Sequence, residues 1–374
     1  YDGVHKTPDY TDGGIMFLSV ENISTLKSEK YISEEAFNRD FKVYPEKGDV
    51  LMTRIGDVGT PNVVETTKKV AFYVSLALLK PTDIDSYFLC NSILSPFFQN
   101  GLKERTLVTA IPQKINKDEI GKVSLFVSTS IDEQREIGAF FQSLDNLITL
   151  HQREIDRIVC LRKAMVEKMF PQNGADVPAV RFSRYKEPWR LCQFSEIFTE
   201  RHIIDTISDE YPQLAFTIEE GVIRPEDKKT NKRDFLIIDK ATKKYLQTEY
   251  DDIIYNPANV IYGAIHRNAL GKGCVSPIYK IFYTDQDSTF MECIVRHPNF
   301  IKEISRSMEG TVKKLRTLKP KAFLEMSAYI APTIEEQRQI GEYFRQMDRL
   351  IEIEKEELEK IKHIKSACLE KMFV

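Results

Sequence analysis

The sequence predicts an α+β fold in which two globular α/β modules are separated by two long antiparallel helices that form a coiled coil. Three observations support this prediction. A segment of about 40 residues occurs twice, and each copy has the apolar period of a long amphipathic helix. The stretches between the copies combine short β-rich runs with turn residues. The duplication gives the chain a pseudo-two-fold repeat.

The repeat is the most informative feature of the chain. Residues 131–170 align without a gap with residues 334–373, and every aligned pair is separated by 203 positions. About 17 of some 40 aligned pairs are identical, which is more than a shared helical pattern produces. The two copies therefore predict one structural element made twice.

Both copies begin and continue as helices. Ser130 followed by Glu133, and Thr333 followed by Glu336, fit the capping box that pairs the first free backbone amides. Apolar residues then recur at steps of four and three, as in the a/d seam of a coiled coil of about five heptads. The residues predicted to pack helix against helix are Ile137, Phe141, Leu144, Ile148, Ile155, Ile158 and Met165 in the first copy and Ile340, Phe344, Met347, Ile351, Leu358 and Ile361 in the second, with Met169, Cys368 and Met372 continuing the pattern.

Polar residues interrupt the seam at the same two places in both copies. They are His151 and Arg162 in the first copy, and Glu354 and Lys365 in the second. Two interpretations stay open: long side chains extend from the seam edge to solvent, or polar a/d residues fix the helix register.

A module joins the end of one helix to the start of the other, so an antiparallel pair places one module at each end. A helix of about 40 residues is about 60 Å long, and the helices are therefore predicted to act as a spacer. The predicted segments are a first module over 1–128, a helical region over 129–170, a linker over 171–188, a second module over 189–332 and a helical region over 333–374.

Composition limits the class of protein. A chain of 374 residues accommodates two domains, and no window contains the roughly 18 uncharged apolar residues of a membrane span. The six cysteines form no Cys-x-x-Cys pair, which is typical of reduced core thiols in a cytoplasmic protein. The net charge of −3 does not by itself favour nucleic acid as a partner.

A search for catalytic motifs predicts a binding protein and not an enzyme. The sequence contains no Gly-x-x-x-x-Gly-Lys-Ser/Thr loop for ATP and no glycine-rich turn after a strand for a nucleotide cofactor. Asn256-Pro257 is only faintly similar to a methyltransferase signature, because Ala258 and Asn259 replace a proline and an aromatic residue. The histidines lack metal-ligand spacing, so we expect no metal site, no catalytic residues and no cofactor.

Polar and basic residues at predicted turns are the candidates for binding. Arg, Asn, Gln and His side chains can read base edges, whereas Lys mostly neutralises phosphate. The DNA-contact candidates are His5, Lys6, Thr7, Thr53, Arg54, Lys103, Arg105 and Lys114 in the first module and Asn256, Asn259, His266, Arg267, Asn268, Lys272, Lys313, Lys314 and Arg316 in the second.

Several motifs carry a resemblance to a known family. The two helices that begin Ile-Asp/Glu-Glu-Gln-Arg and end Glu-Lys-Met-Phe resemble the helical regions of type I restriction-modification specificity subunits. Residues 1–20 resemble the opening of one class of target-recognition domain, and residues 252–283 resemble another. Trp189-Arg190-Leu191 resembles the usual start of such a domain, and the first module has no counterpart of it. We therefore expect the first module to be incomplete at its N-terminus.

The resemblance implies a function for the whole chain. Each target-recognition domain would read one half of a bipartite double-stranded DNA target, and the helices would set the spacer and dock two methyltransferase subunits. S-adenosylmethionine, ATP and Mg²⁺ would be held by the methyltransferase and restriction subunits, so this chain needs no cofactor of its own. Two alternatives stay open: a coiled-coil protein-interaction scaffold without DNA specificity, and a stand-alone nuclease or methyltransferase.

Overall fold

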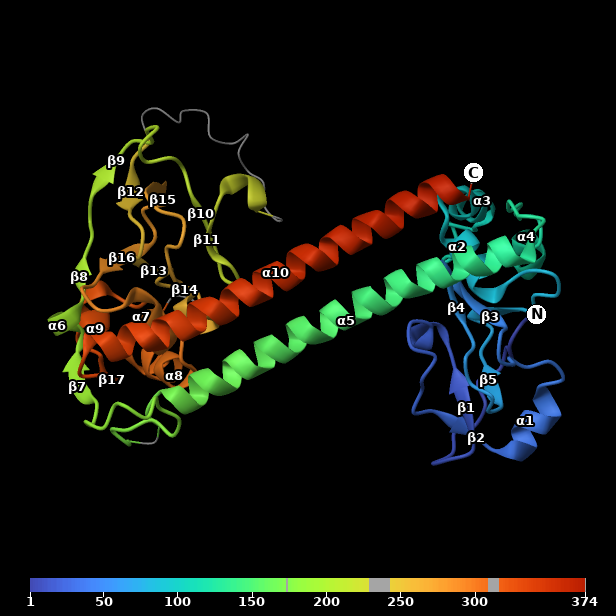
Figure 1. Cartoon of the computed structure of the whole chain (residues 1–374), viewed down its shortest axis with the longest axis horizontal. Helices are drawn as coiled ribbons and strands as arrows, with labels where there is room; N and C mark the ends of the chain where they lie inside the picture. The colour runs from blue at the N-terminus through green and yellow to red at the C-terminus, as the bar shows by residue number, and fades with distance from the viewer. Residues whose placement is uncertain (173, 229–242, 309–315, 374) are drawn as a thin grey trace. The chain divides into compact units, whose positions relative to one another are not determined.

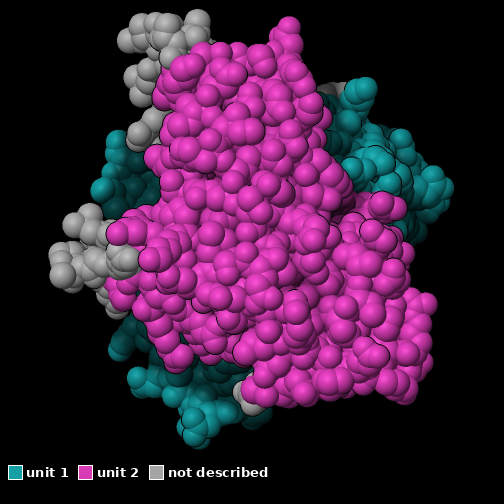
Figure 2. Space-filling model, turned by 90° about the vertical axis from the view of Figure 1, so that its left-hand side faces the viewer, with its two compact units in different colours: residues 1–154, 354–374 teal, residues 155–353 magenta. Residues whose placement is uncertain are grey.

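The computed structural model describes residues 1–172, 174–228, 243–308 and 316–373 (Figure 1). The chain divides into two compact units (Figure 2). Unit 1 comprises Tyr1–Glu154 with Glu354–Val374, and unit 2 comprises Ile155–Ile353. Each unit therefore contains one module together with part of each long helix. Among the described residues, no helix is both long enough and apolar enough to cross a membrane.

The two long helices are α5 (Ile131–Met169) and α10 (Ile334–Met372), which confirms the predicted pair. In unit 1, Lys365 Nζ lies 2.5 Å from the carboxylate of Asp145. In unit 2, the guanidinium of Arg162 bonds both carboxylate oxygens of Asp348 at 2.5 and 3.0 Å. A residue near the start of one helix thus pairs with a residue near the end of the other, so the helices are antiparallel within each unit.

The polar interruptions of the seam are explained by these pairs. Arg162 and Lys365 occupy equivalent positions of the repeat, and each binds the equivalent aspartate of the opposite helix. His151 and Glu354 are also equivalent, and they contact each other at 2.7 Å. The structure therefore favours the interpretation in which polar seam residues fix the register.

The predicted seam residues are buried or half-buried. In unit 1, Phe141 and Leu144 belong to a cluster that also includes Ile361. In unit 2, Phe344 and Met347 belong to a larger one. Met372 departs from the prediction because its side chain is exposed, and the next residue, Phe373, is buried instead against Phe88 and Phe141.

The two modules share a core that sequence comparison did not reveal in full. In unit 1 it is a sheet of order β4-β3-β6 and a helix pair; in unit 2 it is a sheet of order β14-β13-β16-β8 and a helix pair. The unit 1 elements are β3 (Val50–Ile55), β4 (Asp57–Val63), β6 (Leu76–Leu79), α2 (Ser86–Leu94) and α3 (Pro96–Arg105). The unit 2 elements are β8 (Thr199–Glu200), β13 (Ile253–Tyr255), β14 (Ile265–Arg267), β16 (Lys280–Tyr283), α7 (Ser288–Val295) and α8 (Pro298–Ser307).

The outer parts of the modules differ. Unit 1 has a second sheet of order β2-β1-β5, whereas unit 2 has a sheet of order β15-β12-β9, a hairpin β10-β11 and a pair β17-β7. In unit 1 these parts are β1 (Ile15–Leu18), β2 (Tyr31–Ile32), α1 (Glu34–Asp40), β5 (Val70–Phe72) and α4 (Lys117–Ile120). In unit 2 they are β7 (Arg190–Gln193), α6 (Phe194–Ile197), β9 (Ile204–Asp205), β10 (Ala215–Thr217), β11 (Gly221–Ile223), β12 (Tyr245–Thr248), β15 (Gly273–Val275), α9 (Pro320–Leu324) and β17 (Ser327–Ile330).

Each module is attached to its helix by the same contact. Asp85 caps α2, and its backbone N–H donates to Gln134 Oε1 on α5 at 2.9 Å. Asp287 caps α7, and its N–H donates to Gln337 Oε1 on α10 at 3.2 Å. A Cβ at Gly138 would meet Asp85, and one at Gly341 would meet Asp287. Glycine is therefore needed for this close approach of helix and module.

Candidate nucleic-acid interface

In unit 1, a strand turn and a loop are joined by reciprocal hydrogen bonds. The N–H of Gly56, in the β3–β4 turn, donates to Gln113 O at 2.8 Å, and Gln113 Nε2 donates to Gly56 O at 3.0 Å. The loop closes where the N–H of Leu107 donates to Lys114 O at 2.8 Å. We call residues 55–57 and 107–114 the turn–loop surface. Its loop exposes Val108 and Ile111, so it projects apolar as well as polar groups.

Two predicted contact residues lie beneath this surface. Arg54 is 6% exposed; its Nε donates to Ile115 O at 3.1 Å, and it forms an ion pair with Asp2. Thr53 is fully buried, and its hydroxyl accepts from the N–H of Thr60 at 2.9 Å. Because their polar groups are used within the chain, both residues support the surface and do not face solvent.

The other candidates of the first module are closer to solvent. Lys114 is exposed and belongs to the turn–loop surface itself. Lys103 is exposed on α3, and Arg105, on the same helix, is half-buried and donates to Gly101 O at 3.1 Å. On the N-terminal segment, His5, Lys6 and Thr7 are all exposed.

In unit 2, Asn268 lies at the centre of a turn network. Its Nδ2 donates to Glu249 O at 2.9 Å and to Gly271 O at 2.7 Å, and its Oδ1 accepts from the N–H of Leu270 at 3.0 Å. The side chain is fully buried and also reaches the hydroxyl of Thr248 at 3.1 Å. Asn268 therefore joins the turns that follow β12 and β14, and its amide group is used within the chain.

His266 is also an interior residue. Its Nε2 donates to Ile218 O at 2.8 Å, beside the β10–β11 hairpin, and its ring packs edge-on against Phe216 at 5.7 Å. Burial is the main reason that the pKa of His266 is lowered to about 4, with Arg296 lowering it further and Glu292 acting in the opposite direction. The imidazole is therefore neutral at pH 7 and attaches the hairpin to the central sheet.

The basic candidates of unit 2 have acidic partners. Arg267 is half-buried, and its Nη1 lies 2.8 Å from Asp251 while its Nε lies 3.6 Å from Glu292. Lys272 is exposed and forms an ion pair with Glu210. Because these charges are already compensated, they attract phosphate less strongly than isolated cations would.

The last candidates occupy two other turns. Asn256 is half-buried, and its Oδ1 accepts from the N–H groups of Ala258 and Asn259 at 3.0 and 3.2 Å. Asn259 is also half-buried. Arg316 donates to Met308 O at 2.8 Å. Lys313 and Lys314 lie outside the described residues.

Reasoning from charge and hydrogen bonding missed the exposed apolar and aromatic side chains. Ile111 is fully exposed in the turn–loop surface, and Tyr250 and Tyr262 are exposed in unit 2. Their sequence signal was available, since each is a large apolar residue within a run of turn residues. Such side chains can stack on bases or contact groove walls.

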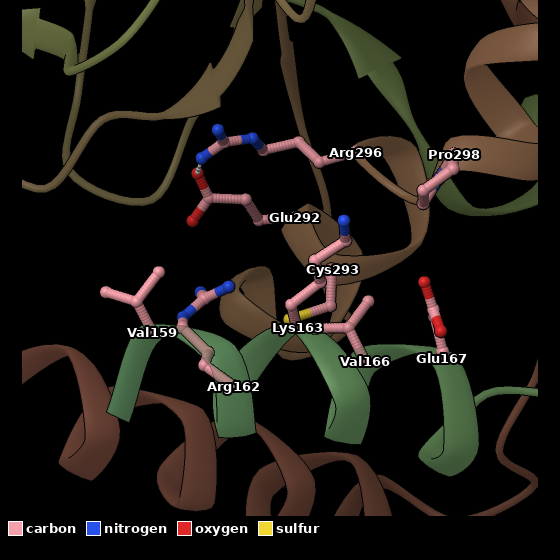
Figure 3. Close-up of a pocket in the computed structure, with 9 residues that line it drawn as sticks. All are labelled: Val159, Arg162, Lys163, Val166, Glu167, Glu292, Cys293, Arg296 and Pro298. Carbon is pink, nitrogen blue, oxygen red and sulfur yellow. Dashed lines mark hydrogen bonds and ion pairs between the residues drawn. The ribbon is translucent and has the colours of Figure 1, made fainter. Parts of the chain in front are cut away.

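A pocket of about 260 Å³ in unit 2 lies between α5 and the α7–α8 corner (Figure 3). Arg162 lines it while bound to Asp348, and Arg296 lies 3.5 Å from Glu292. Burial raises the pKa of the Cys293 thiol to about 12, so this sulfur is not an activated nucleophile. Within the described ranges, no His, Cys, Asp and Glu side chains are grouped to hold a metal ion.

Comparison with known sequences finds one matching domain and similar proteins. Residues 5–159 match the type I restriction modification DNA specificity domain. The type I restriction enzyme MjaVIII specificity subunit of Methanocaldococcus jannaschii is 22% identical over 289 residues, which cover 72% of this chain and 65% of that protein. The putative type I restriction enzyme MjaX specificity subunit of the same organism is 24% identical over 337 residues, which cover 86% of this chain and 76% of that protein.

Comparison with solved structures agrees on the fold. The type I restriction-modification S subunit from M. genitalium matches 100% of this chain and 92% of its own, with a TM-score of 0.61 at 16% identity. The predicted architecture of two α/β modules and two long helices is therefore confirmed. The matched domain, the relatives and the fold all resemble type I restriction-modification specificity subunits.

Proposed function

We propose that the chain is the sequence-specific DNA-binding subunit of a type I restriction-modification complex, with each module reading one half of a bipartite double-stranded target. One observation carries this proposal. The contact that attaches a module to its helix is duplicated, through Gln134 in unit 1 and Gln337 in unit 2, whereas the outer sheets of the modules differ. Modules that are attached to their helices in the same way, but that differ in their outer sheets, suit two domains that recognise different DNA sequences.

In this proposal the candidates that reach solvent make the DNA contacts and the interior ones support them. Lys114 and the turn–loop surface would contact DNA from unit 1, and the half-buried Asn259 and the exposed Tyr262 from unit 2. Lysine would neutralise phosphate, and asparagine and the loop side chains would contact base edges. Because the chain has a net charge of −3, we expect partner subunits to supply part of the phosphate neutralisation.

The long helices would set the spacer between the half-sites and dock two methyltransferase subunits. Those subunits would bring S-adenosylmethionine, and restriction subunits would bring ATP and Mg²⁺, so that this chain is non-catalytic and acts in the cytoplasm. The repeat supports this assignment because two equivalent helical surfaces suit two equivalent partners.

The test is to reconstitute the chain with its methyltransferase subunits and to map methylated adenines on genomic DNA. Lys114→Ala should relax or weaken one half of a bipartite site, and Asn259→Ala the other half. Arg135→Ala, an exposed change on α5, is the control and should leave the site unchanged. If both module variants alter the same half, the assignment of one module to each half is wrong.

The alternative is a coiled-coil interaction scaffold without DNA specificity. It accounts for the helices. It does not explain why the two modules are attached by equivalent contacts and yet differ in their outer sheets. A complex with methyltransferase subunits that binds no DNA at any salt concentration would favour this alternative.

A further inference from the structure

The loop of the turn–loop surface in unit 1 is held at its base by hydrogen bonds. The N–H of Leu107 donates to Lys114 O at 2.8 Å, and the N–H of Ile115 donates to Arg54 O, on β3, at 3.0 Å. Ile115 itself is fully buried. The residues between Leu107 and Lys114 therefore project from a base that is anchored to the sheet of the module.

The tip of this loop is apolar. The side chain of Ile111 is fully exposed and that of Val108 is 69% exposed, with only Thr109 and Ala110 between them. Gln113 uses its Nε2 within the surface, where it donates to a backbone carbonyl of the β3–β4 turn at 3.0 Å. The tip therefore offers mainly apolar atoms, and a partner that covers them gains free energy because water leaves apolar surface.

The second module has a loop with the same anchor. Leu318 lies 203 positions after Ile115 and is also fully buried. Its N–H donates at 3.0 Å to Pro257 O, in the turn that follows β13, as the N–H of Ile115 does to a carbonyl of β3. The two loops thus end at equivalent places in their modules.

The tips of the two loops differ in sequence. The positions 203 residues after Ala110 and Ile111 hold Lys313 and Lys314, which lie outside the described residues. A shared anchor with a different tip is expected of loops that select different bases. The full exposure of Ile111 also supports a role in selectivity, because a side chain surrounded by solvent contributes little to folding.

The charge beside the loop suits a nucleic acid. Lys103 and Lys114 are exposed before and after the tip, and neither forms an ion pair within the part of the chain that the structure describes. The exposed carboxylate of Asp57 accepts from the hydroxyl of Thr53 at 3.1 Å, so this neighbouring negative charge is bonded within the module. Two lysines beside an apolar tip favour DNA as the partner, because they attract phosphate.

We propose that Val108 and Ile111 recognise thymine in the half-site of unit 1 by covering its 5-methyl group in the major groove. This inference rests on the proposed function and adds the base chemistry that one module selects. The thymine methyl is an apolar group in the major groove that cytosine lacks. An apolar tip makes no hydrogen bond there, so it favours the methyl group and disfavours polar base edges that would lose water without gaining a partner.

The experiment uses the full chain in complex with its methyltransferase subunits, and duplexes that carry the target found by methylation mapping. Each thymine is replaced in turn by deoxyuridine, which removes only the methyl group, and Kd is measured by fluorescence anisotropy. At one or more thymines of the half read by unit 1, deoxyuridine should weaken binding by about fourfold, as expected for one buried methyl group. In the double variant Val108→Ala/Ile111→Ala, the thymine and deoxyuridine duplexes should bind equally.

Three controls separate this role from others. Ile111→Val keeps an apolar tip and should keep the preference for thymine. Lys114→Ala should weaken binding to both duplexes by the same factor, because a phosphate contact does not depend on the methyl group. Deoxyuridine in the half read by unit 2 should have the same effect on the wild type and on the double variant. Since Val108 and Ile111 are exposed, their replacement should not unfold the module.

The outcomes distinguish this inference from the proposed function. A complex that reads a bipartite target, but has no thymine whose methyl preference depends on Val108 and Ile111, overturns the inference and leaves the proposed function standing. A double variant that no longer assembles with the methyltransferase subunits in size-exclusion chromatography also overturns it, since the tip would then contact a protein. A complex that binds no DNA refutes the proposed function and this inference with it.

Discussion

Asn268 and Lys272 lie four positions apart, and both residue types can contact DNA. The structure gives them different places. Asn268 is fully buried and its amide makes five hydrogen bonds, whereas Lys272 is exposed, forms an ion pair with Glu210 and lies over the ring of Tyr211. Residue type alone could not separate these roles, because the partners of Asn268 come from turns distant in the sequence.

This difference predicts unequal effects on stability. Asn268→Ala leaves buried carbonyl and amide groups without partners, so we expect a loss of about 3 kcal/mol in the free energy of unfolding. Lys272→Ala should change it by less than about 0.5 kcal/mol, because the ion pair is exposed. Urea unfolding followed by the fluorescence of Trp189, the single tryptophan of the chain and a residue of unit 2, measures both. Equal effects would show that the network is not structural.

His266 predicts a pH dependence for unit 2. Its pKa is lowered from 6.5 to about 4 in the folded chain by burial, so the unfolded chain binds the proton more readily. This contribution to stability is complete above pH 6.5 and is lost as the pH falls toward 4, by about 3 kcal/mol at most.

The corresponding measurement is the free energy of unfolding between pH 4 and pH 6.5, again from Trp189 fluorescence. His266→Gln keeps a donor for Ile218 O but does not titrate, so the slope should become shallower. His202→Gln, at an exposed position, should keep the wild-type slope. An unchanged slope in His266→Gln would mean that another group carries the acid sensitivity.

At the scale of elements, α5 and α10 each hold a module through one buried glutamine. Gln134 Nε2 donates to Ser128 O at 2.7 Å, and Gln337 Nε2 donates to Ala331 O at 2.9 Å, so each glutamine joins the segment before its helix to the N-cap of the module helix. The sequence repeat contained both glutamines, but their function became clear only when the caps Asp85 and Asp287 were placed beside them.

We therefore predict that Gln134→Ala loosens α2 and Gln337→Ala loosens α7, each by about 2 kcal/mol, because a buried N–H and a carbonyl lose their partners. Hydrogen exchange of the amides of α2 and α7 measures the effect of each glutamine contact separately. Arg135→Ala and Arg338→Ala, the exposed neighbours in each repeat, serve as controls. If either single substitution made the amides of both α2 and α7 exchange faster, the two glutamine contacts would not be independent.

At the scale of the whole molecule, the helices carry the proposed spacer function. Deleting seven residues from each helix, at 149–155 and 352–358, removes equivalent heptads that include the paired His151 and Glu354. The helices shorten by about 10 Å, which corresponds to about three base pairs. Methylation mapping should show both half-sites unchanged and a spacer shorter by about that number. A folded variant with the original spacing would refute the spacer role.

The sequence by itself determined the duplicated helices, the division into two modules and the positions of the seam residues. These features are local or periodic, so the spacing of apolar residues such as Phe141 and Phe344 is enough to predict them. The fold class followed for the same reason.

Only the tertiary structure decided which polar residues support the modules and which face solvent. Arg54, His266 and Asn268 are interior because atoms from distant segments, Ile115 O, Ile218 O and Gly271 O, fold over them. Burial and hydrogen bonding are properties of a three-dimensional environment, so side chains with the same chemistry in the sequence acquire different roles.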